Sequence, residues 1–569
     1  MDRARTKNSV ALALLTLILS ACEPSPELAA ADKIYFGGPI VTVDDAQPSA
    51  EAVAVREGQI LAVGTLADIE AHKSADTKVV DLNGRTLVPG FIDGHAHVAS
   101  FGTQAIGANL LASPDGNIAT IDDVVAELRS FSDSPHLSRI GWIYGMGYDD
   151  SVLAEKRHPT RDDLDKVSTE LPVIAVHISG HFIAVNSKGL ELIGYSASTE
   201  DPDGGVIRRR AGSREPNGVL EELAAIPIMM QVLSPSTAED ATFFLEHGLE
   251  LAMSYGYTTA QDGRTFSQTH ELLASYANSN GLPIDVVSYI DYATPAALES
   301  AWRSPEYRNG YRVGGMKVTL DGSPQGRTAW RTQPYLIPPD GQDANYAGYA
   351  AMTDELAIAT IDKAYANNWQ VLVHANGDAA IDQMLLAVRK ATENYGGGDR
   401  RTTLVHGQYI RMDQLDEMVK LEMTASLFPM HTFYWGDWHK EIIGDELGNR
   451  ISPTRSALDR GLPVTSHTDA PVALPNLMQV MWASVNRTSR SGATIGSEER
   501  LTPLEALKAV TLWGARQHFE EDDKGSIEVG KLADLVILSA NPLTVKPSTI
   551  NQIVVLETIK GGKVVWRRE

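Results

Sequence analysis

The sequence predicts an α/β protein built on a TIM-type (β/α)8 barrel, and two patterns carry that prediction. Between about residues 88 and 519, short apolar runs alternate with amphipathic segments such as Asp378 to Tyr395 and Pro503 to Gln517, which is typical of parallel βα units. Eight of the apolar runs have the length of strands, and eight is the number of strands in such a barrel. The strands are expected at residues 91–97, 257–263, 284–292, 315–322, 369–377, 402–410, 422–429 and 462–469.

The two ends of the chain have a different pattern. Residues 33–87 and 520–569 contain short strand-like runs separated by turns with Gly and Asp. Each end is too short for a core of its own, so we expect one composite β-sandwich made from both. Residues from about 105 to 240 separate the first two barrel strands, and we expect them to form an insertion over the barrel mouth.

The composition excludes some kinds of partner. The chain has 569 residues, of which 43% are hydrophobic, so it can bury a large core. Its 49 Lys and Arg against 73 Asp and Glu give a net charge of −24, which repels nucleic acid and anionic lipid at long range. We therefore expect no nucleic-acid partner. The sequence leaves a homo-oligomer open.

Residues 1–22 have the pattern of an export signal. Basic residues precede an apolar run from Val10 to Leu19, which is too short to span a bilayer as a helix. The run leads into Leu19-Ser20-Ala21-Cys22, which resembles the bacterial lipobox, where the cysteine is lipidated; a plain secretory signal cut nearby is the alternative. Residues 23–32 are expected to be a tether. We expect an exported protein that contacts membrane only through the lipid on Cys22, in the outer membrane and facing the periplasm.

His95 and His97 are the first sign of a metal site. If Phe91 to His97 is extended, both imidazoles point to the same face at the C-terminal end of the first strand. Neutral imidazole is a good ligand for Zn²⁺ and related ions. Alone, the pair is equally compatible with two ordinary loop histidines. Ligand residues on the other strands therefore decide whether the sequence indicates a metal site.

Four further polar residues lie inside later strands or at their ends. Lys317 is in the fourth strand, His374 in the fifth and His406 in the sixth, and Asp469 ends the eighth. A single histidine inside an apolar run is more often a satisfied core residue. Together with the first pair, however, these residues indicate a metal site at the C-terminal ends of the strands, where the active sites of such barrels lie.

Seven longer segments carry a more specific pattern, namely "GRTLVPGFIDGHAH", "GHFIAVNSKGL", "KVTLDGSPQGRTA", "VHANGDAAID", "LVHGQ", "SHTDAPV" and "GSIEVGKLADLVIL". The chain after residue 32 resembles the amidohydrolase superfamily, and specifically its YtcJ-like branch, amidohydrolase family 3. The resemblance implies a TIM-type barrel beside a small β-sandwich, with one or two divalent metal ions, commonly zinc. The chain departs from the family at "SHTDAPV", because His467 and Thr468 stand where the usual motif has Gly and Ser.

The resemblance also implies a role for each ligand. The first ion would be held by His95, His97 and Asp469, and the second by His374 and His406. Lys317 would react with CO₂ and bridge two ions as a carbamate; the alternative is an amine beside one ion. Asp469 would also act as general base and then acid for a metal-bound hydroxide.

The sequence also suggests residues that contact the substrate. His431, in "FPMHTFYWGDWH" after the seventh strand, is expected to stabilise an oxyanion, and an ordinary loop histidine is the alternative. His177 lies in the insertion near the expected mouth. Further substrate contacts are expected from Tyr434, Trp435, Trp438, His181, Gln325 and Arg327. The alternative for the three aromatic residues is plain loop packing, and the alternative for Arg327 is an ion pair with a barrel carboxylate.

We therefore expect a metal-dependent hydrolase of a C–N bond other than a peptide bond. Its substrate would be an amide, an N-acyl compound or an N-substituted formamide, since the resemblance includes N-substituted formamide deformylases. A deaminase or cyclic-amide hydrolase with the same site is one alternative. A regulatory or binding lipoprotein with a degenerate site is another, and the presence of all six ligands disfavours it. A dipeptide substrate would need a cationic pocket, whereas an apolar formamide would need the Trp-rich wall.

Overall fold

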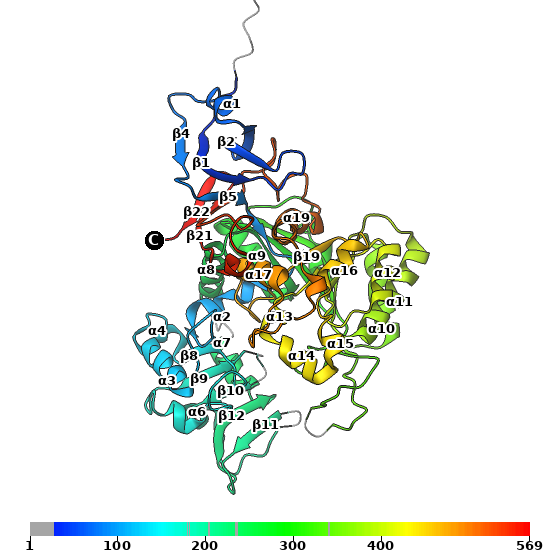
Figure 1. Cartoon of the computed structure of the whole chain (residues 1–569). Helices are drawn as coiled ribbons and strands as arrows, with labels where there is room; N and C mark the ends of the chain where they lie inside the picture. The colour runs from blue at the N-terminus through cyan, green and yellow to red at the C-terminus, as the bar shows by residue number, and fades with distance from the viewer. Residues whose placement is uncertain (1–27, 179, 181, 203–204, 234–236, 340–341) are drawn as a thin grey trace, which may run out of the picture.

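Three sheets organise the chain. The computed structural model describes residues 28–569, apart from residues 179, 181, 203–204, 234–236 and 340–341. Figure 1 shows the sheet built from the two chain ends at one end of the molecule and the sheet of residues 108–222 at the other. An eight-stranded sheet and its helices lie between them. The expected signal segment and residues 23–27 of the expected tether lie outside the described residues, so lipidation of Cys22 stays a prediction.

The central sheet is parallel, and its strand order is β19-β18-β17-β16-β15-β14-β13-β6. Each strand overlaps one of the eight expected strands. Among the described residues no ladder joins β6 to β19. Two backbone hydrogen bonds nevertheless join the segments after them, from Asp469 N to His95 O at 3.1 Å and from His97 N to Ala470 O at 2.9 Å. The strands are β6 (Phe91–Ile92), β13 (Tyr257–Thr265), β14 (Asp285–Asp291), β15 (Tyr311–Thr319), β16 (Gln370–Ala375), β17 (Thr403–His406), β18 (Thr424–Leu427) and β19 (Val464–Ser466).

Helices connect these strands. The expected helix from Asp378 to Tyr395 has those bounds, and it buries one face against the core. The expected helix from Pro503 to Gln517 is instead two helices, because Thr511 leaves the helical conformation (φ −135°, ψ −96°). The helices are α8 (Ala238–Ser254), α9 (Ser267–Ser279), α10 (Asp354–Ala366), α11 (Asp378–Tyr395), α12 (Met412–Lys420), α13 (His431–Tyr434), α14 (Gly436–Ile443), α15 (Asp445–Gly448), α16 (Thr454–Asp459), α17 (Leu477–Asn486), α18 (Pro503–Ala509) and α19 (Leu512–Gln517).

The first strand of the central sheet is shorter than predicted. It ends at Ile92, and the carboxylate of Asp93 then accepts a hydrogen bond from the backbone N–H of His95 at 3.1 Å. Such a bond from a side chain to the backbone two residues on stabilises a turn. The prediction that Phe91 to His97 is extended is therefore wrong, although the rings of His95 and His97 still lie 5.0 Å apart.

The sheet at the chain ends has strands from both termini. Its order is β22-β21-β20-β5-β1-β2-β3, with β4 beside β1. It is one continuous sheet rather than the expected pair of sheets, because β5 pairs with β1 on one side and β20 on the other. Ala31, in the expected tether, is buried against it. The elements are β1 (Lys33–Val41), β2 (Ser49–Arg56), β3 (Gln59–Gly64), α1 (Leu66–Glu70), β4 (Lys78–Asp81), β5 (Thr86–Pro89), β20 (Leu535–Leu538), β21 (Val555–Lys560) and β22 (Lys563–Arg567).

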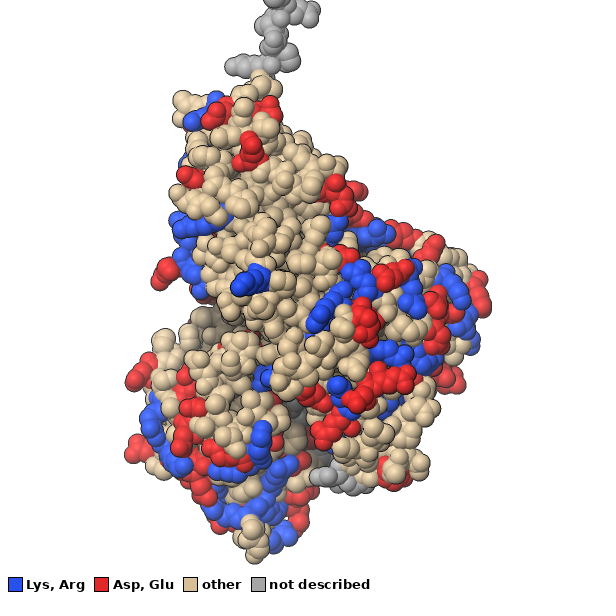
Figure 2. Space-filling model, in the orientation of Figure 1, with Lys and Arg blue, Asp and Glu red and all other residues tan. Residues whose placement is uncertain are grey.

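The segment between β6 and β13 contains a third sheet with its own hydrophobic core. The strand order is β11-β12-β10-β9-β8-β7. Figure 2 shows that Lys and Arg are interspersed with Asp and Glu on the visible face of this segment. None of the helices in the described residues is long and apolar enough to cross a membrane. The elements are α2 (Phe101–Ile106), β7 (Ala108–Asn109), α3 (Ile121–Ser130), α4 (Leu137–Ile140), β8 (Ile143–Tyr148), α5 (Arg161–Leu164), β9 (Val173–His177), β10 (Phe182–Val185), α6 (Ser187–Ile193), β11 (Gly205–Arg209), β12 (Pro216–Glu222) and α7 (Ile226–Leu233).

A buried ionic cluster joins the central sheet to the segment after α19. The Glu520 carboxylate accepts from Arg312 of β15 at 2.6 Å and lies 3.2 Å from Lys524. Lys524 in turn donates to Asp285 of β14 at 2.5 Å. Burial alone would raise the pKa of Glu520, but the charges of Lys524 and Arg312 hold it well below its ordinary value of 4.5.

We expect Glu520→Gln to lower the free energy of unfolding at pH 7 by about 3–5 kcal/mol, because it leaves buried cations without their partner. The folded pKa of Glu520 is depressed, so its contribution is present above about pH 4.5 and is lost as pH falls below it. Urea unfolding of the parent and the variant at pH 7 and pH 4 measures both effects. Glu521→Gln is the control, since Glu521 pairs with Arg401 nearer the surface; an equal loss in both variants would contradict the prediction.

Candidate metal centre

The six predicted ligands lie at one edge of the central sheet. His95 and His97 follow β6, Lys317 and His374 are inside β15 and β16, His406 is the last residue of β17, and Asp469 follows β19. The strands are parallel, so their C-terminal ends meet at this edge. His406 and Asp469 have φ values of +79° and +52°. A positive φ is uncommon for residues other than glycine, and strained backbone of this type clusters at functional sites.

Asp469 lies at the centre of the group. Its Oδ1 is 3.4 Å from His97 Nε2 and 3.6 Å from His95 Nε2, and its Oδ2 is 3.9 Å from His406 Nδ1. One ligand atom from each of His95, His406 and Asp469 lies within 4.8 Å of the other two. The family resemblance implied that His95, His97 and Asp469 hold one ion. The geometry places His406 within reach of His95 and Asp469 as well.

His95 is held so that its Nε2 lone pair points into this group. Its Nδ1 lies 2.7 Å from Gln261 Oε1, which can only accept, so Nδ1 carries the proton. Nε2 is then unprotonated and accepts from Lys317 Nζ at 3.0 Å. Gln261 is itself oriented, because its Nε2 donates to Gly94 O at 2.9 Å. A hydrogen bond of this kind fixes the tautomer of a metal-binding histidine.

His374 and His406 form the other half of the group. Their ring centroids are 4.5 Å apart. The Nε2 atom of His374 is 3.1 Å from Gly322 O and 3.4 Å from Asp321 Oδ1, so its Nδ1 is the nitrogen left for a ligand. Asp321 is held by backbone N–H groups, including that of Asn376 at 2.9 Å. The loop after β15 therefore orients His374.

Burial makes most of these groups good ligands at neutral pH. It lowers the pKa of His95 and of His406 well below the ordinary value, so both imidazoles are neutral. It also lowers the pKa of Lys317 to about 7. For Asp469 burial acts in the opposite direction, but the hydrogen bond from His97 and the nearby positive charges lower its pKa below the ordinary value. The site thus presents the neutral imidazoles of His95 and His406 and one ionised carboxylate.

His467 adds a fifth imidazole to the group. It is fully buried, its ring lies 5.4 Å from His95 and 5.1 Å from His406, and burial lowers its pKa to about 3. Neither of its ring nitrogens has a hydrogen-bond partner among the described residues. An unpaired buried polar atom is costly, so this site is suited to a polar group or cation that the protein itself does not supply.

His431 lies near this group, and the aromatic residues around it pack on one another. Its ring is 4.5 Å from that of Trp435 and 4.8 Å from that of Phe428. Tyr434 does not point freely into a substrate space, because its hydroxyl donates to Asp115 of the insertion. The expected aromatic wall is therefore partly a contact between the loops of the central sheet and the insertion.

The loop after β15 reaches the same wall. The Arg327 guanidinium lies 5.7 Å from the ring centroid of Trp438 and donates to Pro338 O at 3.2 Å, while its buried Nε has no partner among the residues that the structure describes. Gln325 is half-buried in this loop. The tertiary structure thus brings together Arg327 and Trp438, which are far apart in the sequence.

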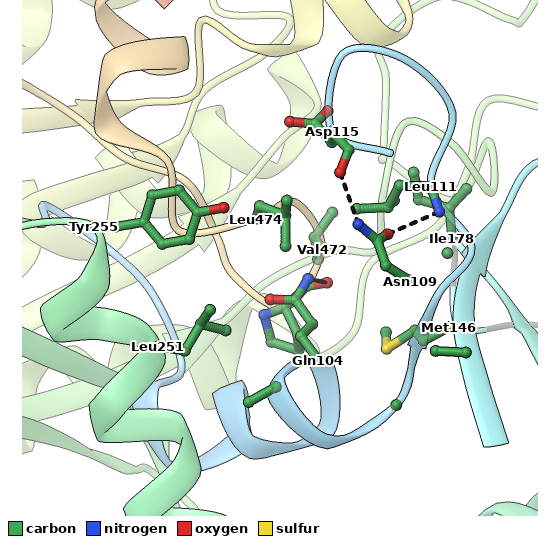
Figure 3. A pocket seen from close by; sticks show the side chains of 15 residues that line it. Gln104, Asn109, Leu111, Asp115, Met146, Ile178, Leu251, Tyr255, Val472 and Leu474 are labelled. Carbon is green, nitrogen blue, oxygen red and sulfur yellow. Dashed lines mark hydrogen bonds between the residues drawn. The ribbon is translucent and has the colours of Figure 1, made fainter. Parts of the chain in front are cut away.

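The insertion holds the remaining predicted contacts. His177 Nε2 lies 3.0 Å from Asp150 Oδ1, inside the insertion rather than among the metal ligands. His181 lies outside the described residues. A cavity of about 270 Å³ lies between α2, α8, the insertion and the loop of residues 471–474 that follows Asp469. Figure 3 shows Gln104 and Asp115 among apolar side chains around it.

Sequence reasoning missed the residues that orient the ligands and His431. Gln261, Asp321 and His439 each hold a predicted site residue, and Tyr409 in turn holds His439. Gln261 and Asp321 stand at the ends of expected strands, in "YTTAQDG" and "KVTLDG", which was the available signal. His439 and Tyr409 had no local signal, because each makes its contact only in the folded chain.

The comparisons with known proteins agree with this geometry. The model of the amidohydrolase family matches residues 78–566. The chain belongs to this family. This amidohydrolase is 26% identical to the putative amidohydrolase YtcJ of Bacillus subtilis (strain 168) over 556 residues, which cover 94% of the chain and 99% of that protein. It is 27% identical to the N-substituted formamide deformylase of Arthrobacter pascens, over 94% and 98% of the two chains.

A solved structure supports the fold. The crystal structure of an uncharacterised metal-dependent hydrolase from Pyrococcus horikoshii OT3 matches with a TM-score of 0.70 and 23% identity, over 90% of this chain and 99% of that one. The resemblance found in the sequence segments is thus confirmed, and the protein is a hydrolase of the amidohydrolase family. Its donor set, with buried neutral imidazoles, one ionised carboxylate and the unpaired nitrogens of His467, fits a divalent cation.

Proposed function

We propose that this protein hydrolyses the C–N bond of an amide, an N-acyl compound or an N-substituted formamide with the help of bound divalent metal ions, zinc being the first choice. One observation carries the proposal. Neutral imidazoles, Lys317 and a single ionised carboxylate, Asp469, lie together at the C-terminal edge of a parallel sheet. This donor set, which is rich in nitrogen, suits Zn²⁺ better than Mg²⁺ or Ca²⁺, because those two ions prefer oxygen ligands.

The fold that holds the site is proposed to be a closed (β/α)8 barrel. The order of its eight parallel strands follows the chain from β6 to β19. The two backbone hydrogen bonds between residues 95–97 and 469–470 tie the segments after the first and last strands together. The likeness to the Pyrococcus horikoshii hydrolase supports the same architecture.

In this proposal each ligand keeps the role that the family resemblance implies. His95, His97 and Asp469 would hold one ion, His374 and His406 another, and Lys317 would join them as a carbamate. Bound ions would supply a water of lowered pKa and an electrophile for the carbonyl oxygen. Asp469 would take the proton of the attacking water and return it to the leaving nitrogen. His431 would donate to the carbonyl oxygen as negative charge develops on it.

The surroundings favour a substrate with an apolar N-substituent. Trp435 packs on His431, and Trp438 lies on the next helix with Arg327 against its ring. Arg327 is therefore held in place by the aromatic wall, and Arg490 lies 5.2 Å from the ring centroid of Tyr434 in the same wall, so the cations here pack on aromatic rings. The relative named as an N-substituted formamide deformylase supports a formamide as the first compound to test.

A substrate panel tests the proposal. The metal-supplemented protein is assayed against N-benzylformamide, an N-acetyl amino acid, a cyclic amide and an aminopurine, with and without prior chelation. We expect turnover of the formamide or the N-acyl compound, its loss on chelation, and its return when Zn²⁺ is added back. Turnover of the aminopurine alone would favour a deaminase. Stoichiometric metal binding with no turnover of any compound would favour a non-catalytic binding protein.

A further inference from the structure

His431 is the end of a buried chain of hydrogen bonds. Its Nδ1 lies 2.9 Å from Nε2 of His439, and Nδ1 of His439 lies 2.9 Å from the hydroxyl of Tyr409. His431 is 3% exposed, His439 is fully buried and Tyr409 is 7% exposed. The three residues come from the start of α13, from α14 and from the loop after β17. They therefore form one rigid unit beside the metal centre.

The Tyr409 hydroxyl determines which atom donates in each of these hydrogen bonds. The Tyr409 hydroxyl has no other hydrogen-bond partner in the described part of the chain. If it accepted from His439, its own proton would be buried without an acceptor, which costs about 1–3 kcal/mol. It therefore donates to Nδ1 of His439. A neutral imidazole carries one proton, so His439 carries it on Nε2 and donates it to Nδ1 of His431.

The same logic sets the tautomer of His431. Its Nδ1 accepts, so its proton lies on Nε2, the ring nitrogen for which the described residues supply no partner. Both rings are neutral at pH 7, because burial lowers the pKa of His439 to about 3 and that of His431 well below its ordinary value. Burial also raises the pKa of Tyr409 well above its ordinary value, which keeps the hydroxyl protonated.

The position of His431 makes this N–H useful. His431 follows β18 at the sheet edge where His406 and Asp469 lie, and Phe428 lies between its ring and that of His467. A neutral donor at this edge stabilises an oxygen that becomes negative during the reaction, and it does not compete with a metal ion as a ligand. The other tautomer would present a lone pair and repel that oxygen.

We propose that Tyr409 and His439 are positioning residues that lock His431 as the tautomer protonated on Nε2, so that it donates to the carbonyl oxygen of an acyl substrate. The donation rests on the proposed function, whereas the tautomer does not. The direct measurement is ¹⁵N NMR of protein labelled at histidine, without substrate, with the His431 signals assigned by their loss in His431→Gln. We expect a protonated Nε2 and an unprotonated Nδ1.

Three variants test the chain of hydrogen bonds. Tyr409→Phe and His439→Leu should each remove the constraint on the His431 tautomer, and they should lower kcat by about 10-fold with little change in KM, since they act on charge that develops in the transition state. His439→Gln should restore part of the rate, because its amide N–H can donate to Nδ1 of His431. The matched control is Tyr335→Phe, which removes a hydroxyl that donates to Ala329 O in the same apolar cluster; it should leave the tautomer and kcat unchanged.

The outcomes are distinct. His431 protonated on Nδ1 in the parent would overturn the proposal, and so would an unchanged kcat in both Tyr409→Phe and His439→Leu on a substrate that the parent hydrolyses. Equal effects of Tyr335→Phe and Tyr409→Phe would also overturn it, because they would point to a general loss of packing. If the parent shows the expected tautomer but hydrolyses no amide, the proposed function fails and the donation to a substrate fails with it, while the hydrogen-bond chain stands.

Discussion

Replacing Asp469 with asparagine should lower kcat by at least about 10²–10⁴-fold while leaving the fold intact. The side chain keeps its shape, and the backbone hydrogen bond from Asp469 N to His95 O does not involve the carboxylate. What the amide loses is the ability to take a proton. In the parent the hydrogen bond from His97 and the positive charges around Asp469 keep its pKa below the ordinary value, so the carboxylate is ionised and ready to act as a base at neutral pH.

The measurement must separate the two roles of Asp469. Activity on the best substrate of the panel, metal content by elemental analysis and the thermal midpoint are measured on the same preparation. A large loss of kcat at full metal content supports the base role. If metal is lost in proportion to activity, Asp469 acts mainly as a ligand. Activity close to that of the parent at full metal content would rule out both roles.

The second large effect is expected at Lys317. This side chain is 2% exposed and lies within β15. It donates to Nε2 of His95, the nitrogen to which a metal ion would bind. Burial lowers its pKa to about 7, so a large share of the amine is neutral near pH 7 and can react with CO₂. A carbamate would place two oxygens where the structure has an ammonium or amine. Its negative charge would offset part of the positive charge of two divalent ions.

Lys317→Ala should therefore reduce the metal content from two ions per chain to one or none, and abolish turnover. The control is Lys508→Ala, which removes a mostly buried lysine paired with Asp45 away from the site; it should keep both ions. Adding a short carboxylic acid such as propionate to Lys317→Ala should restore part of the metal content, because the acid can occupy the space of the carbamate. Two ions in Lys317→Ala without any additive would contradict the carbamate bridge.

The two variants also distinguish an enzyme from a binding protein, but they do not distinguish an amidase from a deaminase. A regulatory or binding lipoprotein could keep a metal ion, but it would not need a base with a depressed pKa beside it. A deaminase would respond to both substitutions as an amidase does, since it needs the same activated water and the same base. Only the substrate panel separates those two, because the difference lies in the shape of the pocket and not in the ligands.

The sequence by itself predicted the six candidate metal ligands and identified the family. His95, His97, Lys317, His374, His406 and Asp469 could be found because each stands at the end of an apolar run or inside one, and parallel strands bring their C-terminal ends to one edge. The helix from Asp378 to Tyr395 was equally visible, since its apolar period of 3.6 residues is a local property of the chain.

Only the tertiary structure decided how these residues are held. Gln261 sets the tautomer of His95, although the two residues are 166 positions apart in the sequence. Tyr434 was expected to contact substrate but bonds to Asp115 of the insertion. The chain from Tyr409 through His439 to His431 likewise joins three separate elements. Hydrogen bonds between distant residues depend on packing, which no local periodicity encodes, and they decide whether a nitrogen in this site donates or accepts.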